Sequence, residues 1–130
     1  DFKTLLLNCI QQADEMGTTR FNLDCNPMID WESVSGLIKI TLYRIIQEAL
    51  SNVSKYAEAS ECQVVIFIKD KQTIDLLISD NGKGFDINTI TTQGIGLKNM
   101  KERAEKVNSN LSITTQLGEG TQIQCSFTID

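Results

Sequence analysis

The sequence predicts an α/β two-layer sandwich, in which helices cover one face of a mixed β-sheet. Three observations lead to this fold class. Stretches with apolar residues at helical spacing are followed by shorter stretches in which apolar and polar residues alternate, and this sequence of patterns recurs along the chain. Their order along the chain is helix, strand, helix, two strands, helix and two strands. The 130 residues, 41% of them hydrophobic, suffice for a single domain over residues 1–130 but not for two.

The first part of the chain predicts a helix, a short strand and the longest helix. Helical spacing over residues 2–16 ends at Gly17, and residues 18–26 alternate weakly up to Pro27. A second helical pattern runs from about residue 31 to residue 57. The inward residues of the first helix are expected to be Phe2, Leu5, Leu6, Cys9, Ile10, Ala13 and Met16. Those of the long helix are expected to be Leu42, Ile45, Ile46, Ala49, Leu50, Val53 and Ala57.

Two consecutive strands are predicted next, residues 61–70 and 72–80, joined as a hairpin at Asp70-Lys71. Side chains of a strand point alternately to its two faces. Asp80 therefore falls on the same side as the apolar row of Ile74, Leu76 and Ile78. We expect a carboxylate to point inward where a buried strand ends.

The last part of the chain predicts a polar connection, a helix and a closing hairpin. The connection covers residues 86–93, and the helix is expected to begin near Gly96. Residues 111–117 turn at residues 118–120 into residues 121–130, whose alternation predicts a half-buried strand. The inward residues of the helix are expected to be Leu97, Met100, Ala104 and Val107.

The composition excludes several classes of function. A net charge of −5 without a basic run argues against nucleic acid or an anionic membrane as partner. The chain holds no histidine, which excludes histidine metal ligands, Ser-His and Cys-His catalysis and a histidine phosphoacceptor within it. The four cysteines are scattered and interpreted as small apolar residues in a reducing compartment, with a disulfide as the alternative.

The long helix carries the first candidate site. Glu48, Asn52 and Lys55 cluster on one side at 100° per residue, with Tyr56 at the edge. A carboxylate, an amide and an ammonium group one turn apart can hold a hydrated divalent cation and neutralise phosphate. The alternative is a solvated helix face.

The second candidate site is the segment Asp80-Asn81-Gly82-Lys83-Gly84-Phe85. The inward carboxylate of Asp80 needs hydrogen-bond donors, and the exocyclic amine of a purine could supply one. Gly82 and Gly84 have no Cβ, so a flat ring could lie against the backbone. The alternative is a tight turn capped by Asp80 or Asn81.

Gly94, Gly96 and Leu97 form the third candidate site, where a helix opens. Free backbone N–H groups and the helix dipole favour an anion there, although ordinary helix caps also use glycine. The chain contains neither a P-loop motif nor the glycine spacing of a Rossmann fold.

In this order, the three sites resemble the ATP-binding domain shared by histidine kinases, gyrase, Hsp90 and MutL. LYRIIQEALSNVSKYAEAS resembles its N box, DNGKGF its G1 box, GIGLKNMKERAE its G2 box and GEGTQIQCSF its closing hairpin. LYRIIQEAL and GLKNMKERA resemble the sensor histidine kinases of the NarL type most closely. The fold that the resemblance implies is the Bergerat ATP-binding fold, with ATP and Mg²⁺ as cofactors.

On the base side, the resemblance implies that Asp80 accepts a hydrogen bond from the adenine amine. Gly82 and Gly84 would shape the base pocket, and Thr121 would support it. Gly94, Gly96 and Leu97 would form the hinge of a lid and its phosphate-facing amides.

On the phosphate side, the resemblance implies catalytic roles for Glu48 and Asn52. Asn52 would coordinate Mg²⁺ between the phosphates, and Glu48 would orient a metal-bound water or position the γ-phosphate. Lys55 would contact phosphate. Tyr56 stands where the family often has histidine, and it can donate a hydrogen bond but cannot carry a positive charge.

The resemblance also implies partners and a reaction. The γ-phosphate would pass to a histidine on an upstream dimerisation domain of the same kinase, which would then serve a response regulator. This chain would be a cytoplasmic catalytic domain excised from a membrane-anchored parent, without membrane contact of its own. Two alternatives stay open: a serine protein kinase of the anti-sigma-factor type, and a degenerate nucleotide-binding or docking module without phosphotransfer.

Overall fold

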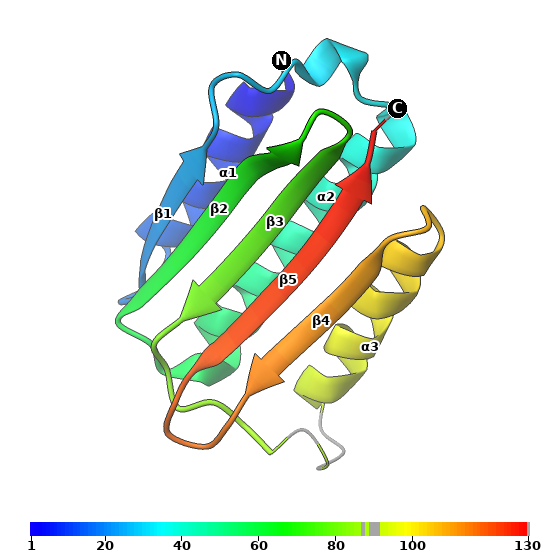
Figure 1. Ribbon diagram of the computed structural model, residues 1–130. Helices are drawn as coiled ribbons and strands as arrows, with labels where there is room; N and C mark the ends of the chain where they lie inside the picture. Colours follow the sequence, from blue (N-terminus) through cyan, green and yellow to red (C-terminus); the bar gives the residue numbers. More distant parts are fainter. Residues whose placement is uncertain (87, 89–91, 130) are drawn as a thin grey trace.

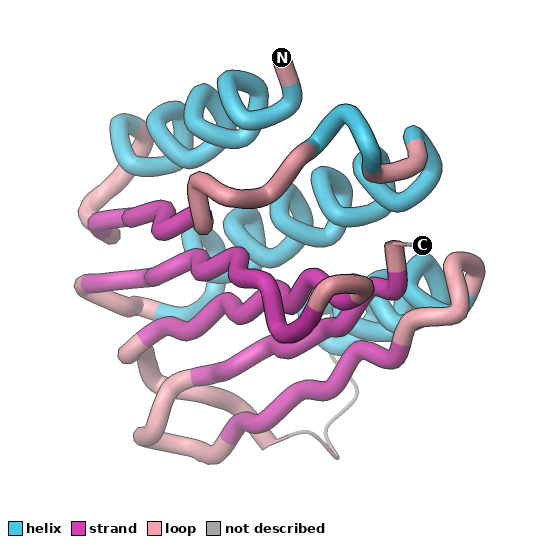
Figure 2. The backbone as a smooth tube through the Cα atoms, turned by 45° about the horizontal axis from the view of Figure 1, so that its top comes forward, coloured by secondary structure: helices cyan, strands magenta, loops and turns pink. Residues whose placement is uncertain are grey.

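In the computed structural model, the helices lie on one face of a five-stranded sheet (Figure 1). The structure describes residues 1–86, 88 and 92–129. Helices and strands form two separate layers (Figure 2), so the predicted two-layer sandwich is confirmed. The helices are α1 (Phe2–Glu15), α2 (Gly36–Asn52) and α3 (Thr92–Glu105). The strands are β1 (Arg20–Cys25), β2 (Glu61–Asp70), β3 (Thr73–Asp80), β4 (Asn110–Thr115) and β5 (Thr121–Thr128).

The sheet is mixed, as predicted, with the strand order β1-β2-β3-β5-β4. β1 runs parallel to β2, and every other neighbouring pair is antiparallel. β3 is the central strand, and its last residue, Asp80, pairs with Cys62 of β2 and Thr121 of β5. The backbone at Asp80 therefore has a paired strand on each side.

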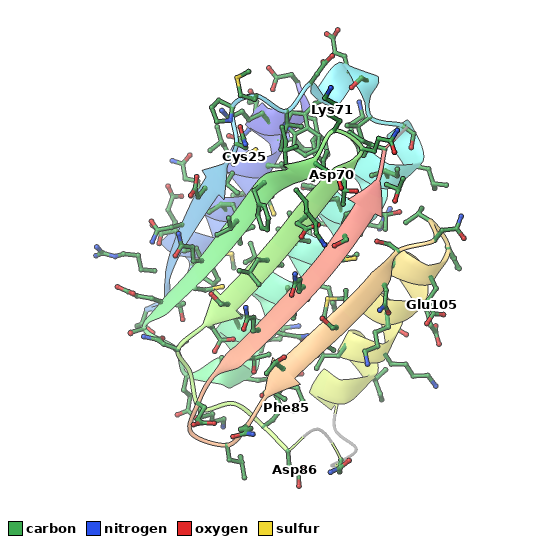
Figure 3. All side chains as sticks on the ribbon, viewed as in Figure 1. Cys25, Asp70, Lys71, Phe85, Asp86 and Glu105 are labelled. Carbon is green, nitrogen blue, oxygen red and sulfur yellow. The ribbon has the colours of Figure 1, made fainter. Side chains whose placement is uncertain are left out.

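The candidate sites lie at the end of the sheet where β3 finishes. The β2–β3 turn, marked by Asp70, lies at the opposite end from Asp86 (Figure 3). The β4–β5 hairpin returns to the same end as the segment after β3, since the amide of Gly118 donates to the carbonyl of Lys83 at 2.5 Å. The fold thus brings three distant parts of the sequence to one end of the molecule.

The helix predicted from about residue 31 begins later than expected. Residues Trp31–Ser33 form a separate 3-10 turn, and α2 starts at Gly36 because the Ser35 side chain accepts the amide of Ile38 at 3.2 Å. The last turn, Val53–Ala57, is a π-helix rather than an α-helix. This widened turn changes the directions of the side chains that follow Asn52.

α3 begins at Thr92, four residues before the expected start near Gly96. Gly94 and Gly96 therefore lie within the first turns of the helix rather than ahead of it. Parts of the predicted polar connection, residues 87 and 89–91, lie outside the described residues. No helix in the described part of the chain is long and apolar enough to cross a lipid bilayer.

The core lies between the helices and the inner face of the sheet. The predicted inward residues of α2, β3 and α3 are buried, with Val107 half-buried. On α1 the prediction is wrong for two residues. Leu5 is 44% exposed because it faces away from the sheet, and Met16 is 85% exposed because it follows the last turn of the helix. All four cysteines are free, which contradicts the disulfide alternative.

Candidate functional site

One small cavity lies where α2, α3 and the ends of β3 and β5 meet. It is lined by Ala49, Asn52, Val53, Ala57, Ile78, Asp80, Leu97, Thr121 and Ile123. The cavity therefore brings together residues from all three predicted sites and from the last strand. These residues are Asn52, Asp80, Leu97 and Thr121. The cavity has a volume of about 10 Å³, close to the room that one water molecule needs. A larger ligand would have to push its walls apart.

Asp80 is half-buried and reaches this cavity from the end of β3. Burial raises the pKa of its carboxyl group, while hydrogen bonds from the backbone N–H groups of Gly82 and Thr121 act to lower it. The amide of Gly82 donates to Asp80 Oδ1 at 2.8 Å, so the carboxylate caps the tight turn that follows the strand. The turn and the cavity are thus not alternatives, because one carboxylate serves both.

The side chain of Asn52 is buried in the wall of the same cavity, with 7% of the residue exposed. Among the residues that the structure describes, its Nδ2 atom has no hydrogen-bond partner. A buried polar group without a partner costs roughly 1–3 kcal/mol. The Nδ2 atom of Asn52 is thus placed to donate a hydrogen bond to an acceptor that enters the cavity.

Gly96 brings α3 into direct contact with the polar side of α2. A Cβ at this position would collide with Glu48 Oε1 and lie 3.5 Å from Asn52 Nδ2. Glu48 and Asn52 are one turn apart on α2, so the carboxylate and the unpartnered amide lie next to each other beneath this glycine. Because the atom met is the end of the Glu48 side chain, a methyl group at position 96 would require that carboxylate to move.

The family described as histidine kinase-, DNA gyrase B-, and HSP90-like ATPase matches residues 38–130. The chain belongs to this ATPase family.

Curated relatives of this ATPase domain are named sensor histidine kinases or sensor proteins. The sensor histidine kinase LiaS of Bacillus subtilis is 37% identical over 105 residues, which are 78% of this chain and 29% of LiaS. YxjM of the same organism is 35% identical over 124 residues, 95% of this chain and 29% of YxjM. VraS of Staphylococcus aureus is 40% identical over 83 residues, 64% of this chain and 24% of VraS. The chain thus spans about a quarter of these relatives' length.

Solved histidine kinases share the fold of this ATPase domain. The Acinetobacter baumannii kinase AdeS superposes with a TM-score of 0.76 at 14% identity, over 100% of this chain and 66% of that one. The mycobacterial kinase MprB superposes with a TM-score of 0.71 at 16% identity, over 99% of this chain and 96% of that one. At these identities the likeness shows the fold alone.

In this ATPase domain, Gly82 and Gly84 are needed for backbone packing. A Cβ at Gly82 would collide with the carbonyl of Ala57, and one at Gly84, where φ is +63°, with the carbonyl of Gln116. The amide of Lys83 donates to the Ala57 carbonyl at 2.8 Å. Neither glycine lines the cavity. The glycines allow the segment after β3 to pack against protein backbone, and their expected contact with a base stays a prediction.

Lys55 and Tyr56 lie on the π-helical turn and not in the wall of the cavity. Lys55 instead lines a groove of about 600 Å³ between α1 and α2, and Tyr56 is half-buried. The expectation that Lys55 would cluster with Asn52 assumed 100° per residue, and a π-helix turns by less. A phosphate contact by either residue stays a prediction.

Two further residues hold the site together: Asn81, which the sequence suggested only as a cap of the turn, and Thr115, which it did not single out. Asn81 Oδ1 accepts the amides of Ser60 and Glu61 at 3.0 Å each, which ties the end of β3 to the start of β2. Thr115 Oγ1 lies 2.9 Å from Thr121 Oγ1 and supports it in the cavity wall. The role of Asn81 could be suspected from its place in a turn, but no sequence signal indicated Thr115.

Proposed function

We propose that this chain is the catalytic ATPase domain of a NarL-type sensor histidine kinase. It binds Mg-ATP and donates the γ-phosphate to a histidine on an upstream dimerisation domain. One observation carries this proposal: the half-buried carboxylate of Asp80 and the unpartnered amide of Asn52 line the same cavity.

The base side of the site is formed by Asp80 and apolar neighbours. The carboxylate accepts a hydrogen bond from the exocyclic amine of adenine, while Ile78 and Leu97 offer apolar surface to the ring. Thr121 adds a hydroxyl group from β5 at the edge of the cavity. Adenine is larger than the present cavity, so its binding requires α3 to move away from α2.

The phosphate side is formed by Asn52, Glu48 and the start of α3. The described residues contain no cluster of three or more His, Cys, Asp or Glu side chains that could hold a metal by themselves. The side-chain oxygen of Asn52 and the carboxylate of Glu48 would hold Mg²⁺ together with phosphate oxygens, while the unpartnered Nδ2 of Asn52 would donate to a phosphate oxygen. When bound, Mg²⁺ neutralises charge on the phosphates. Glu48 and Asn52 would orient the phosphates, and the first turns of α3, which hold Gly94 and Gly96, would lie beside them.

The reaction requires a second domain, because this chain contains no histidine. We propose that the acceptor histidine lies upstream in a membrane-anchored parent and that a response regulator acts downstream. The chain itself would be located in the cytoplasm. Its match to about a quarter of LiaS, YxjM and VraS supports this division.

Titration with ATP, with and without Mg²⁺, tests the proposal. We expect ATP binding that Mg²⁺ strengthens and that D80N weakens. D24N is the matched control, because Asp24 is an exposed carboxylate on β1, the edge strand. Absence of ATP binding, or equal affinity of D80N and D24N, would contradict the proposal and favour a docking module.

A further inference from the structure

A polar cleft between α2 and α3 lies outside the nucleotide cavity. It has a volume of about 320 Å³, and the two helices that form it lie side by side behind the sheet (Figure 1). Its polar lining comes from both helices and consists of Arg44, Gln47, Glu48, Ser51, Asn99 and Arg103. The role proposed above for the chain uses only Glu48 from this set.

Arg44 and Arg103 are the cations of this cleft, and both are exposed. The ion pair between Lys83 and Glu58 is the only one among the residues that the structure describes, so neither guanidinium group is paired. The charged residues that line the cleft are two cations, Arg44 and Arg103, and one anion, Glu48, whereas the whole chain has a net charge of −5. The cleft is therefore locally cationic on an acidic protein.

Guanidinium groups recognise oxyanions, since their N–H groups match the two oxygens of a carboxylate or phosphate. In the cleft one such group comes from each helix, with the amide side chains of Gln47 and Asn99 as neutral hydrogen-bonding partners beside them. This arrangement suits a ligand with more than one carboxylate, extended along the cleft.

Glu48 connects the cleft with the nucleotide cavity. It lines the cleft, contacts Gly96 and lies one turn from Asn52. Arg44 precedes Asn52 by two helical turns, which places its Cα about 12 Å away along α2. This distance favours a separate ligand over the phosphates that Asn52 would hold. The cleft thus begins where a group that receives the γ-phosphate has to arrive.

We propose that the α2–α3 cleft binds an acidic segment of the protein that accepts the phosphoryl group. Its carboxylates pair with Arg44 and Arg103, and this pairing places the acceptor beside Glu48. The inference rests on the proposed function, because only phosphoryl transfer requires an acceptor there.

A hexa-aspartate peptide serves as the probe, with a hexa-asparagine peptide as its uncharged control. The ¹⁵N-labelled chain is titrated at low salt with saturating Mg-ATP, and the side-chain signals of Gln47, Asn99 and Arg103 are followed. We expect these signals to shift when the hexa-aspartate peptide is added but not when the hexa-asparagine peptide is added. R44Q/R103Q should weaken peptide binding about tenfold. R20Q, which removes an exposed arginine on the distant edge strand β1, should leave it unchanged.

Three results would overturn the inference. The first is equal peptide affinity of R44Q/R103Q and R20Q. The second is peptide binding that occurs without nucleotide and is lost at saturating Mg-ATP, which would assign the cleft to the nucleotide phosphates. The third is an equal response to inorganic phosphate, which would reduce the cleft to a general anion site. ATP titration of R44Q/R103Q checks its fold and reports separately on the proposed function, since ATP binding should persist in this variant.

Discussion

The substitution D80N separates the binding role of Asp80 from its effect on folding. It keeps the shape of the side chain and leaves an oxygen that can accept the amide of Gly82, but it removes the charge. The adenine amine would lose a hydrogen bond to a charged acceptor, which contributes roughly 1.5–3 kcal/mol. Because about 1.4 kcal/mol corresponds to a factor of ten, the Kd for Mg-ATP should rise roughly 10- to 150-fold.

The effect of D80N on stability should have the opposite sign. Burial raises the pKa of Asp80 in the folded state, so its stabilising contribution is complete below the unfolded-state pKa and is lost as the pH rises through the folded-state pKa. Above the folded-state pKa the ionised carboxylate therefore disfavours folding, and an uncharged asparagine removes this cost. D80N should unfold at an equal or higher urea concentration than the wild type.

Isothermal titration calorimetry with Mg-ATP and urea unfolding at pH 7 measure the two effects on the same samples. D24N controls for the removal of a carboxylate, because Asp24 is exposed on β1. A D80N variant that binds ATP as tightly as D24N would refute the assignment of the base site. A clear loss of stability would refute the argument from burial.

Four other predictions follow from the same contacts. G82A should reduce the free energy of unfolding by about 1–3 kcal/mol, since its Cβ would collide with the carbonyl of Ala57. G17A is the control and should leave the free energy of unfolding unchanged, because its Cβ would meet nothing within 4 Å. Equal urea midpoints for G82A and G17A would contradict the close packing of Gly82 against Ala57. N52L should keep or gain stability, because it removes an unpartnered amide, yet lose the Mg²⁺-dependent part of ATP binding. A strongly destabilised N52L would show that the amide has a partner within the protein. ATP affinity should fall on acidification at a pH above the usual titration range of aspartate, because the pKa of Asp80 is raised, and a pH-independent Kd would argue against its role. Burial raises the pKa of the Cys62 thiol to about 12, so peptide mapping after treatment with a thiol reagent at pH 8 should find it unmodified in the folded protein and modified in urea. Rapid native modification would contradict its burial.

The sequence was sufficient to predict which side chains point inward in regular strands and helices, where a period of two or 3.6 residues determines the direction of each side chain. The alternation of Ile74, Leu76, Ile78 and Asp80 correctly predicted that a carboxylate points inward at the end of β3. The apolar arc of α2 likewise predicted its buried face. These inferences succeed because a side chain's direction within regular structure depends only on its position in the chain.

The prediction was weaker where the backbone departs from regular structure. No sequence pattern indicated the π-helical turn Val53–Ala57, so Lys55 was expected beside Asn52 and instead lies towards α1. The start of α2 at Gly36 could have been read from the capping residue Ser35, which the longer apolar pattern concealed.

Glycines pose a related problem. The sequence shows that Gly82 has no side chain, but it does not show which atoms lie next to this position in the fold. In the structure it is the backbone of Ala57, which lies far from Gly82 along the chain. Only the tertiary packing can distinguish space kept for a ligand from space kept for the protein.

The central claim is that Asp80 and Asn52 hold the two ends of one nucleotide. A crystal structure of the chain with Mg²⁺ and a non-hydrolysable ATP analogue tests it most directly. The account predicts the adenine amine at about 3 Å from the Asp80 carboxylate, with the phosphates and the metal beside Asn52. A nucleotide seated elsewhere, such as in the α1–α2 groove beside Lys55, with the cavity at Asp80 still closed, would contradict it.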